Sequence, residues 1–138
     1  MIRILMAEAT DFQGTTQVGS HALAREFVRG GAHVMWIGTP LYPHTLVRPK
    51  DASTRRRMQV WSRGGATAGG VTEYYPLSFL PVMNRPLLDT RRVATHTLRA
   101  TCPPVARVIR GHGFSEPDLL WLSASRFSFP LMSIVRAR

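Results

Sequence analysis

The sequence predicts an α/β fold with a mostly parallel, Rossmann-like sheet and helices on both of its faces. Two apolar segments, 2–7 and 33–38, flank residues 16–29, whose apolar positions recur at helical spacing. A strand, a helix and a second strand in this order normally form a right-handed crossover between parallel strands. A third apolar segment at 119–123 predicts another strand of that sheet. We therefore expect a three-layer arrangement of helices, sheet and helices.

The helix predicted at 16–29 has an apolar face and recognisable ends. Thr15 or Thr16 can cap its start, and Gly30-Gly31 can supply the left-handed residue that ends it. The residues expected to face the sheet are Val18, Ala22, Leu23, Phe27 and Val28.

The regular pattern stops in the middle of the chain. Segment 44–70 is rich in Gly, Pro and Arg and is expected to be a long basic excursion, with one short strand at 58–61. One or two strands within 71–80 follow, then helices at 90–100 and 105–110, and then the 119–123 strand, which is expected to be buried. A last helix should begin near Ser128 and contain the end of the chain.

A chain of 138 residues is sufficient for a single domain, here 1–138, with one hydrophobic core. Because the last predicted elements would leave apolar side chains exposed, we expect this domain to be partial. No apolar run is long enough to cross a membrane, and the start does not resemble a secretion signal. A single cysteine, Cys102, excludes an internal disulfide. These features predict a cytoplasmic protein, with peripheral membrane attachment as one variant.

The charge is strongly positive, with a formal net charge of +10 at pH 7. Twelve of the 18 basic residues lie between Arg48 and Arg110, where the acidic residues are only Asp51, Glu73 and Asp89. Such a field attracts phosphates in nucleotides, nucleic acids or lipid headgroups, although arginines also decorate ordinary solvated surfaces. The segment from Arg48 to Arg63 is the predicted contact with an anionic membrane or a phosphate-bearing acceptor. Nucleic acid is the less favoured partner, because a single Arg triplet is a weak signal.

Candidate binding residues follow from the position of ligands at the carboxyl ends of parallel strands. The loop and helix start after the first strand offer a flexible glycine, hydroxyls and free backbone N–H groups. The alternative is that the Thr and Ser residues only cap and the glycines only turn. The candidate substrate-binding residues are Gln13, Gly14, Thr15, Thr16, Ser20, His21, Thr39 and Ser123.

His21 is the candidate catalytic residue. Its position near the start of the helix would place it on the helix flank, where its imidazole could reach a sugar hydroxyl above the strand ends. A structural role, in which His21 only hydrogen-bonds the 11–14 loop, is the alternative. No metal or cofactor is predicted, because no ligand spacing, Asp-x-Asp pair, G-x-G-x-x-G fingerprint or phosphate-binding P-loop occurs.

Two stretches carry a resemblance to a known family. Residues 18–27 (VGSHALAREF) and 31–37 (GAHVMWI), continued by 38–43 (GTPLYP), resemble the opening of retaining glycosyltransferases of the two-domain GT-B type. The later PDLLW at 117–121 is similar to a strand of the same domain. The resemblance covers about residues 1–43 well and 114–135 moderately, and the single Gly14 departs from the paired glycines expected in the first loop.

The resemblance implies an amino-terminal, acceptor-side domain of an enzyme that uses a nucleotide-sugar. The nucleotide-sugar would bind mainly in a carboxy-terminal domain that this chain lacks, so the chain alone is expected to be inactive. Two other hypotheses stay open. One is a small basic module that binds nucleic acid or an anionic membrane without catalysis, and the other is an unrelated Rossmann-like domain.

Overall fold

The computed structural model describes residues 1–47, 51–80, 91–123 and 128–136, and it shows an α/β domain. A five-stranded sheet has the order β3-β4-β2-β1-β7, in which β4 (Val71–Tyr74), β2 (His33–Ile37), β1 (Arg3–Ala7) and β7 (Leu119–Leu122) are parallel. Only β3 (Ala66–Ala68) is antiparallel, in a hairpin with β4. The predicted pairing of the first two strands with each other, and of the 119–123 strand with them, is confirmed.

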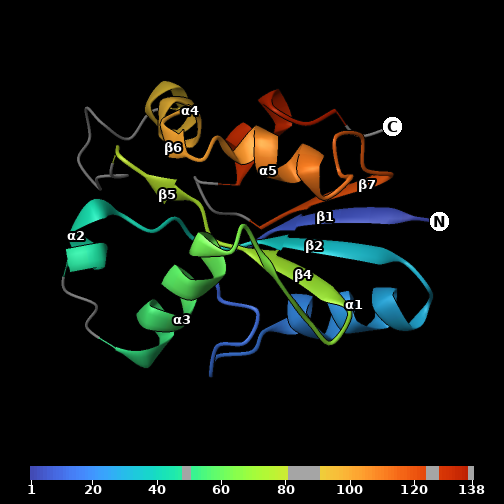
Figure 1. Ribbon diagram of the computed structural model, residues 1–138. Helices are drawn as coiled ribbons and strands as arrows, with labels where there is room; N and C mark the ends of the chain where they lie inside the picture. The colour runs from blue at the N-terminus through green and yellow to red at the C-terminus, as the bar shows by residue number, and fades with distance from the viewer. Residues whose placement is uncertain (48–50, 81–90, 124–127, 137–138) are drawn as a thin grey trace.

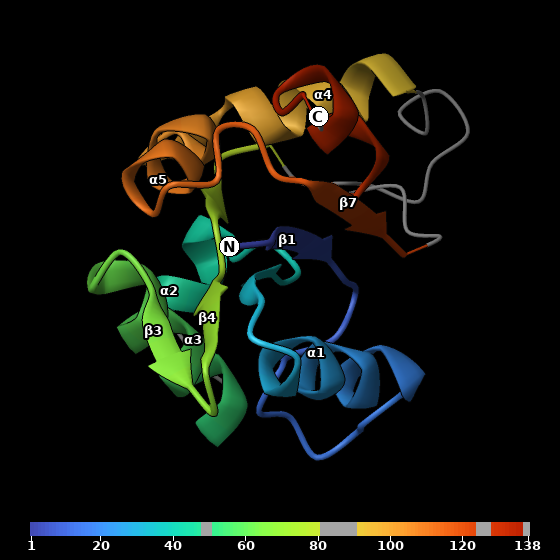
Figure 2. The ribbon, with the colours of Figure 1, turned by 90° about the vertical axis from the view of Figure 1, so that its right-hand side faces the viewer.

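Helices cover the two faces of this sheet (Figures 1 and 2). On one face, α1 (Gly19–Arg29) packs on a cluster formed by alternate strand residues, including Ile4, Met6 and Trp36. On the other face, α4 (Arg91–Arg99), α5 (Val105–Gly111) and the 3-10 helix η1 (Phe129–Ser133) cover the intervening residues, such as Leu5 and Ile37. Strands buried on both faces need continuous apolar sequence, which is the pattern that predicted β1 and β2.

The segment predicted as an irregular excursion is mostly helical, so this prediction is wrong. It contains α2 (Pro43–Val47), α3 (Ala52–Ser62) and β3. Residues 58–61, predicted as a strand, lie within α3. The helix begins at the N-cap Asp51, whose side chain accepts a 2.6 Å hydrogen bond from the Thr54 backbone N–H, and Gly64 at φ 72° follows its end. These are ordinary start and stop signals, and the hydrogen bonds from Thr54 lower the pKa of Asp51.

Helix α1 is shorter than predicted, and its predicted sheet-facing side is confirmed only in part. Phe27 and Val28 pack against the sheet as expected, but the buried residues are His21 and Ala24, whereas Val18 and Ala22 are exposed. Neither Thr15 nor Thr16 caps the helix, because the N-cap is Val18 and its backbone N–H is bonded by the His21 ring. The predicted end is confirmed: Gly30 follows the last turn and Gly31 has φ 82°.

The later elements agree with the predictions in order but not in burial. The helices predicted at 90–100 and 105–110 are α4 and α5, and between them a short strand, β6 (Thr101–Cys102), pairs with β5 (Leu77–Ser78). Strand β7, expected to be buried, is an edge strand among the described residues, with Leu119 40% and Trp121 39% exposed. The expected exposure of apolar side chains on the last elements is therefore confirmed. The last helix is a 3-10 helix that ends at Ser133, before the end of the chain.

Candidate functional site

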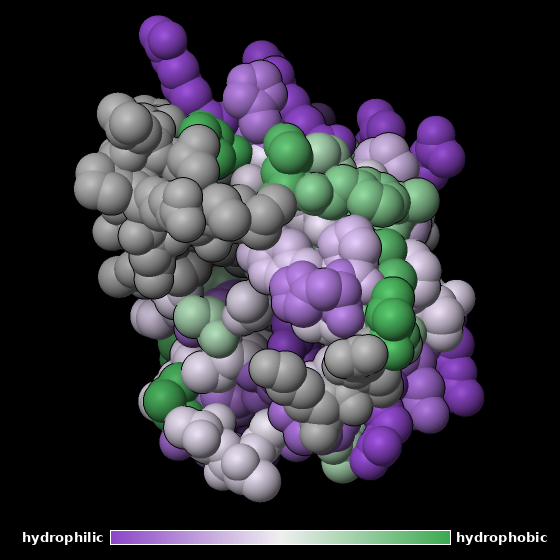
Figure 3. Space-filling model, turned by 90° about the vertical axis from the view of Figure 1, so that its left-hand side faces the viewer, coloured by the Kyte–Doolittle hydropathy of each residue, from purple (hydrophilic) through white to green (hydrophobic). Residues whose placement is uncertain are grey.

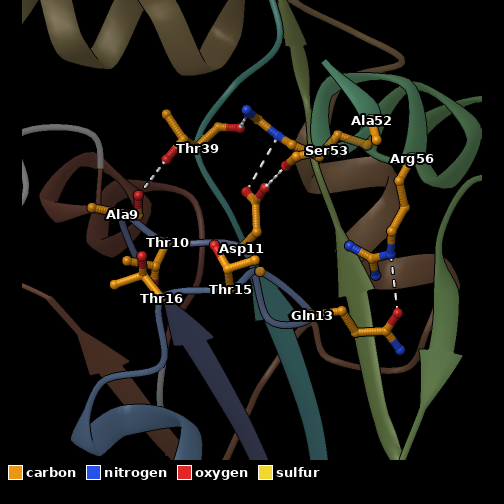
Figure 4. A pocket seen from close by; sticks show the side chains of 12 residues that line it. Ala9, Thr10, Asp11, Gln13, Thr15, Thr16, Thr39, Ala52, Ser53 and Arg56 are labelled. Atoms are coloured by element: carbon orange, nitrogen blue, oxygen red, sulfur yellow. Dashed lines mark hydrogen bonds and ion pairs between the residues drawn. The ribbon is translucent and has the colours of Figure 1, made fainter.

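A pocket of about 530 Å³ opens where the parallel strands end, and we call it the carboxyl-edge pocket. Its floor is the loop after β1, with Thr39 after β2 on one side and the first turns of α3 on the other (Figure 4). Figure 3 looks onto this end of the molecule and shows hydrophilic atoms recessed near the middle of the face. Ligand pockets typically have volumes of about 300–1,000 Å³. The lining residues are Ala9, Thr10, Asp11, Gln13, Gly14, Thr15, Thr16, Thr39, Ala52, Ser53, Arg56 and Arg57.

Five of the eight predicted binding residues lie together in this pocket: Gln13, Gly14, Thr15, Thr16 and Thr39. Thr39 also ties the two loops to each other, because its hydroxyl donates a 2.8 Å hydrogen bond to the Ala9 carbonyl. The strand-end rule found these residues because β1 and β2 are parallel neighbours, so that the loops after them start at the same edge.

Ser20, His21 and Ser123 do not line the carboxyl-edge pocket. Ser20 lies in the first turn of α1, and Ser123 follows β7, where its backbone N–H bonds the Ala7 carbonyl. Both hydroxyl oxygens are buried and have no hydrogen-bond partner within the described part of the chain. The structure therefore separates these three residues from the other five.

His21 is a core residue, 1% exposed, and the expectation that it reaches the strand-end crevice is wrong. Its ring stacks on Phe12 at 5.8 Å and contacts Trp36 at 4.7 Å between centroids. Nδ1 accepts a 3.1 Å hydrogen bond from the Val18 N–H, and Nε2 lies 3.0 Å from the Asp11 carbonyl oxygen. Since a carbonyl can only accept, the neutral ring with its proton on Nε2 satisfies both contacts. The alternative role, bonding the 11–14 loop, is the one that the geometry supports.

We expect His21→Ala to destabilise the fold by about 2–4 kcal/mol, because it removes a packed ring from the core together with its hydrogen bonds to the Val18 N–H and the Asp11 carbonyl. Urea denaturation followed by circular dichroism measures this loss. His33→Ala is a matched control, since His33 is exposed at the start of β2, and it should change stability by less than about 0.5 kcal/mol. Equal stability of the two variants would contradict the structural role.

Helix α3 contributes four pocket residues, Ala52, Ser53, Arg56 and Arg57. None of them is among the eight predicted binding residues, although all four lie in the basic segment predicted to contact an anionic membrane or a phosphate-bearing acceptor. The Ser53 hydroxyl donates a 2.6 Å hydrogen bond to Asp11 Oδ2. Arg57 Nε lies 3.3 Å from Asp11 Oδ1, an ion-pair contact whose geometry is not that of a hydrogen bond, and its Nη2 donates to the Thr39 carbonyl. Asp11 thus holds the helix against the two loops that form the floor.

Arg56 belongs to a second network of polar contacts, next to the one that Asp11 forms with Ser53 and Arg57. Its Nε donates a 3.0 Å hydrogen bond to Gln13 Oε1, and its Nη2 contacts the carboxylate of Glu73, which is 1% exposed at the end of β4. The Tyr75 hydroxyl donates to the other Glu73 oxygen at 3.0 Å and accepts from the Phe12 N–H at 3.2 Å. The Arg57 guanidinium lies 5.2 Å from the Tyr75 ring centroid. Tyr75 therefore joins the two networks.

The two guanidinium groups of the pocket are each balanced by a carboxylate, Arg56 by Glu73 and Arg57 by Asp11. Their positive field is largely cancelled within a few ångströms, because each ion pair acts as a dipole rather than a net charge. Carbon atoms border most of the open volume, and the hydroxyls of the exposed Thr15 and Thr16 and the Gln13 amide lie among its lining. The pocket can therefore offer a few hydrogen bonds without strongly attracting an anion.

The basic triplet at 55–57 is accordingly not a free cationic loop. Arg56 and Arg57 are held inside the two networks, and only Arg55 and, beyond the helix, Arg63 are exposed. Residues 48–50 of the predicted membrane contact lie outside the described residues.

Burial raises the pKa of both Tyr74 and Tyr75. A phenol that stays protonated in the folded state, while the unfolded one ionises near pH 10, makes the fold lose stability as pH rises above about 10. We expect the free energy of unfolding, measured in urea, to fall as pH rises through the range in which the tyrosines of the unfolded chain ionise and the buried ones do not. Tyr74→Phe should reduce the fall and cost little at neutral pH, because the buried Tyr74 hydroxyl has no hydrogen-bond partner among the described residues. A free energy of unfolding that stays constant up to about pH 11 would contradict the raised pKa of these two tyrosines.

Comparison with protein-family models, with curated proteins and with solved structures finds no match to this chain. Among the helices that the structure describes, none is long and apolar enough to cross a membrane. No group of three or more His, Cys, Asp or Glu side chains in the described ranges is arranged to hold a metal ion.

Proposed function

We propose that this chain is the amino-terminal, acceptor-side domain of a glycosyltransferase that uses a nucleotide-sugar, and that the acceptor binds in the carboxyl-edge pocket. The observation that carries the proposal is the pocket itself: a charge-balanced hollow at the carboxyl ends of parallel strands, with threonine side chains and the Gln13 amide among its lining. This is where open α/β sheets bind ligands. The fold is compatible with the Rossmann-like, three-layer domain that such an enzyme would have.

The pocket chemistry suits a neutral, polyhydroxylated acceptor. Thr15 and Thr16 are exposed at its rim, and their hydroxyls can both donate and accept. Gln13 Oε1 is engaged by Arg56, which leaves the amide NH₂ as a donor. A phosphate would have to compete with Glu73 and Asp11 for the two guanidinium groups, whereas a sugar hydroxyl needs no net charge to bind.

The assignment of acceptor binding to this domain and of nucleotide-sugar binding to a second domain depends on the family resemblance. The nucleotide-sugar would bind in that other domain, and this one would position the acceptor hydroxyl at the cleft between them. The 138-residue chain alone should therefore bind simple glycosides but transfer no sugar.

The test is a titration of the isotopically labelled chain with methyl glycosides, followed by amide chemical shifts. We expect shifts at residues 9–16, at Thr39 and at the start of α3. The double variant Thr15→Val, Thr16→Val removes two rim hydroxyls at nearly constant volume and should weaken binding about three- to tenfold. Thr67→Val is the control, because Thr67 is an exposed threonine of the β3–β4 hairpin outside the pocket.

Three results would count against the proposal. Glycoside shifts away from the pocket, or none at all, would remove the acceptor role. Turnover of a nucleotide-sugar by the purified chain would show that no second domain is needed. Equal weakening by the control variant would show that the rim hydroxyls are not the contact.

The net charge of +10 keeps the alternative function, a basic binding module, in view. Its cations would be exposed arginines such as Arg55, Arg63, Arg107 and Arg110. Preferential, salt-dependent binding to duplex DNA, without any response to glycosides, would favour this module over the glycosyltransferase domain.

A further inference from the structure

A second hollow, of about 470 Å³, lies on the other side of the loop that follows β1. Residues from that loop, from α1 and from the turn between β3 and β4 line it, among them Phe12, Gln13, Gln17, Arg25, Arg29 and Gly69. We call it the α1–hairpin hollow. Gln13 lines both hollows, so the same loop separates them.

The walls of this hollow are closely fitted. Gly69 and Gly70, at φ 57° and 80°, make the tight turn of the β3–β4 hairpin. A Cβ on Gly70 would lie 2.5 Å from Val28 Cγ1, so the turn comes against α1 as closely as backbone alone allows. The hollow is therefore formed by packed elements on three sides.

The charge of the α1–hairpin hollow differs from that of the carboxyl-edge pocket. The Arg25 guanidinium lies 5.9 Å from the Phe12 ring centroid, and within the described ranges no carboxylate forms an ion pair with it. Arg29, one helical turn later on the same face, pairs only with Glu26, and both of these side chains are exposed. The nearby Gln17 amide can add N–H donors.

We propose that the α1–hairpin hollow binds a phosphomonoester, independently of the proposed acceptor pocket. Guanidinium groups bind phosphate through paired, charge-assisted hydrogen bonds, and the Arg25 guanidinium is held over the Phe12 ring at the edge of the hollow by a cation–π contact. Arg29 supplies a second guanidinium, because its pair with Glu26 is fully on the surface and therefore weak enough to open, and the volume leaves room for an organic group beside the phosphate. The phosphate that the basic composition attracts is thus bound beside α1 rather than by the triplet on α3.

The experiment is a titration of the labelled chain with inorganic phosphate, with chloride at equal ionic strength as the reference. We expect saturable shifts at residues 12–17, 25–29 and 68–70. Arg25→Ala should weaken phosphate binding about tenfold, and Arg25→Lys should recover only part of this loss, since lysine keeps the charge but not the fork. Arg110→Ala is the matched control, because Arg110 is an exposed arginine of α5 on the opposite face of the sheet.

Thermal unfolding of each variant checks that the exposed substitutions leave the fold intact. Shifts that chloride reproduces, or an equal loss in the Arg110 variant, would overturn the proposal by showing screening alone. So would full recovery by lysine. Sedimentation with phosphatidylcholine vesicles, with and without phosphatidic acid, then separates the sources of the phosphate. Arg25-dependent binding to the acidic vesicles assigns the site to a lipid headgroup, and its absence assigns it to a free phosphomonoester.

Discussion

Replacing Glu73 with glutamine is expected to lower the free energy of unfolding by about 3 kcal/mol, one of the two largest effects that we predict. Glu73 is 1% exposed, and the side chain of Arg56, its ion-pair partner, is 27% exposed. Glutamine can still accept from the Tyr75 hydroxyl, so the loss comes mainly from a half-buried guanidinium without a counter-charge. Denaturation in urea measures it.

Two further variants make this prediction specific. Adding Arg56→Met to Glu73→Gln should restore part of the stability, because it removes the uncompensated charge. Glu26→Gln breaks an exposed pair with Arg29 on the surface of α1 and should cost less than about 0.5 kcal/mol. If Glu73→Gln cost no more than Glu26→Gln, solvent rather than Glu73 would be balancing Arg56.

Glu73→Gln also tests the charge balance of the carboxyl-edge pocket. With Glu73 neutral, Arg56 faces the pocket as a net cation, and phosphate should begin to shift amide signals of residues 9–11 and of Thr39. The unaltered chain should show such shifts only beside α1. Phosphate shifts at residues 9–11 and Thr39 in the unaltered chain would show that the guanidinium groups are not balanced.

Gly38→Ala is the second substitution with a large expected effect. Gly38 follows β2, and a Cβ there would lie 2.3 Å from Cε1 and 2.5 Å from Cδ1 of the buried Tyr75 ring. The ring cannot move without breaking its bonds to Glu73 and Phe12 and its contact with Arg57. We expect a loss of about 3 kcal/mol, together with weaker glycoside binding.

Gly19→Ala is the control for this substitution. A Cβ on Gly19 meets nothing within 4 Å, and the residue begins α1 with ordinary helical geometry. Alanine there should leave stability unchanged or raise it by up to about 1 kcal/mol. A Gly38 variant as stable as the Gly19 variant would mean that the Tyr75 ring has room to move, and the pocket would then lack the rigid support that we describe.

Helix α3 shows why part of the site escaped prediction. Helices are found by the apolar stripe that packs on a core, but the inward side of α3 carries Arg56 and Arg57, which meet carboxylates instead. Only Val60 of this helix is buried. Its cluster of Met58, Val60 and Trp61 therefore resembled a strand, although Asp51 and Gly64 marked a helix start and stop.

His21 shows the converse error. A histidine near a helix start suggests a polar, ligand-facing residue, yet its ring is an apolar surface with two hydrogen-bonding atoms that the backbone satisfies. Helical spacing places His21 on the same face as Ala24 and Val28, three and seven residues later, and a helix that starts at Gly19 rather than Thr16 leaves that spacing unchanged. The loop from Asp11 to Val18 sets that start through contacts distant in sequence.

Three features of this protein could be predicted from its sequence: the α/β class, the parallel pairing of β1 with β2 and β7, and five residues at the carboxyl edge. Those features follow from local periodicity and from the geometry of parallel strands. Three others became visible in the folded chain: β7 lies at an edge of the described sheet, α3 closes the pocket, and carboxylates balance Arg56 and Arg57. Each of these depends on the meeting of residues far apart in the chain, such as Arg56 with Glu73 or Arg25 with Phe12, and no local pattern encodes it.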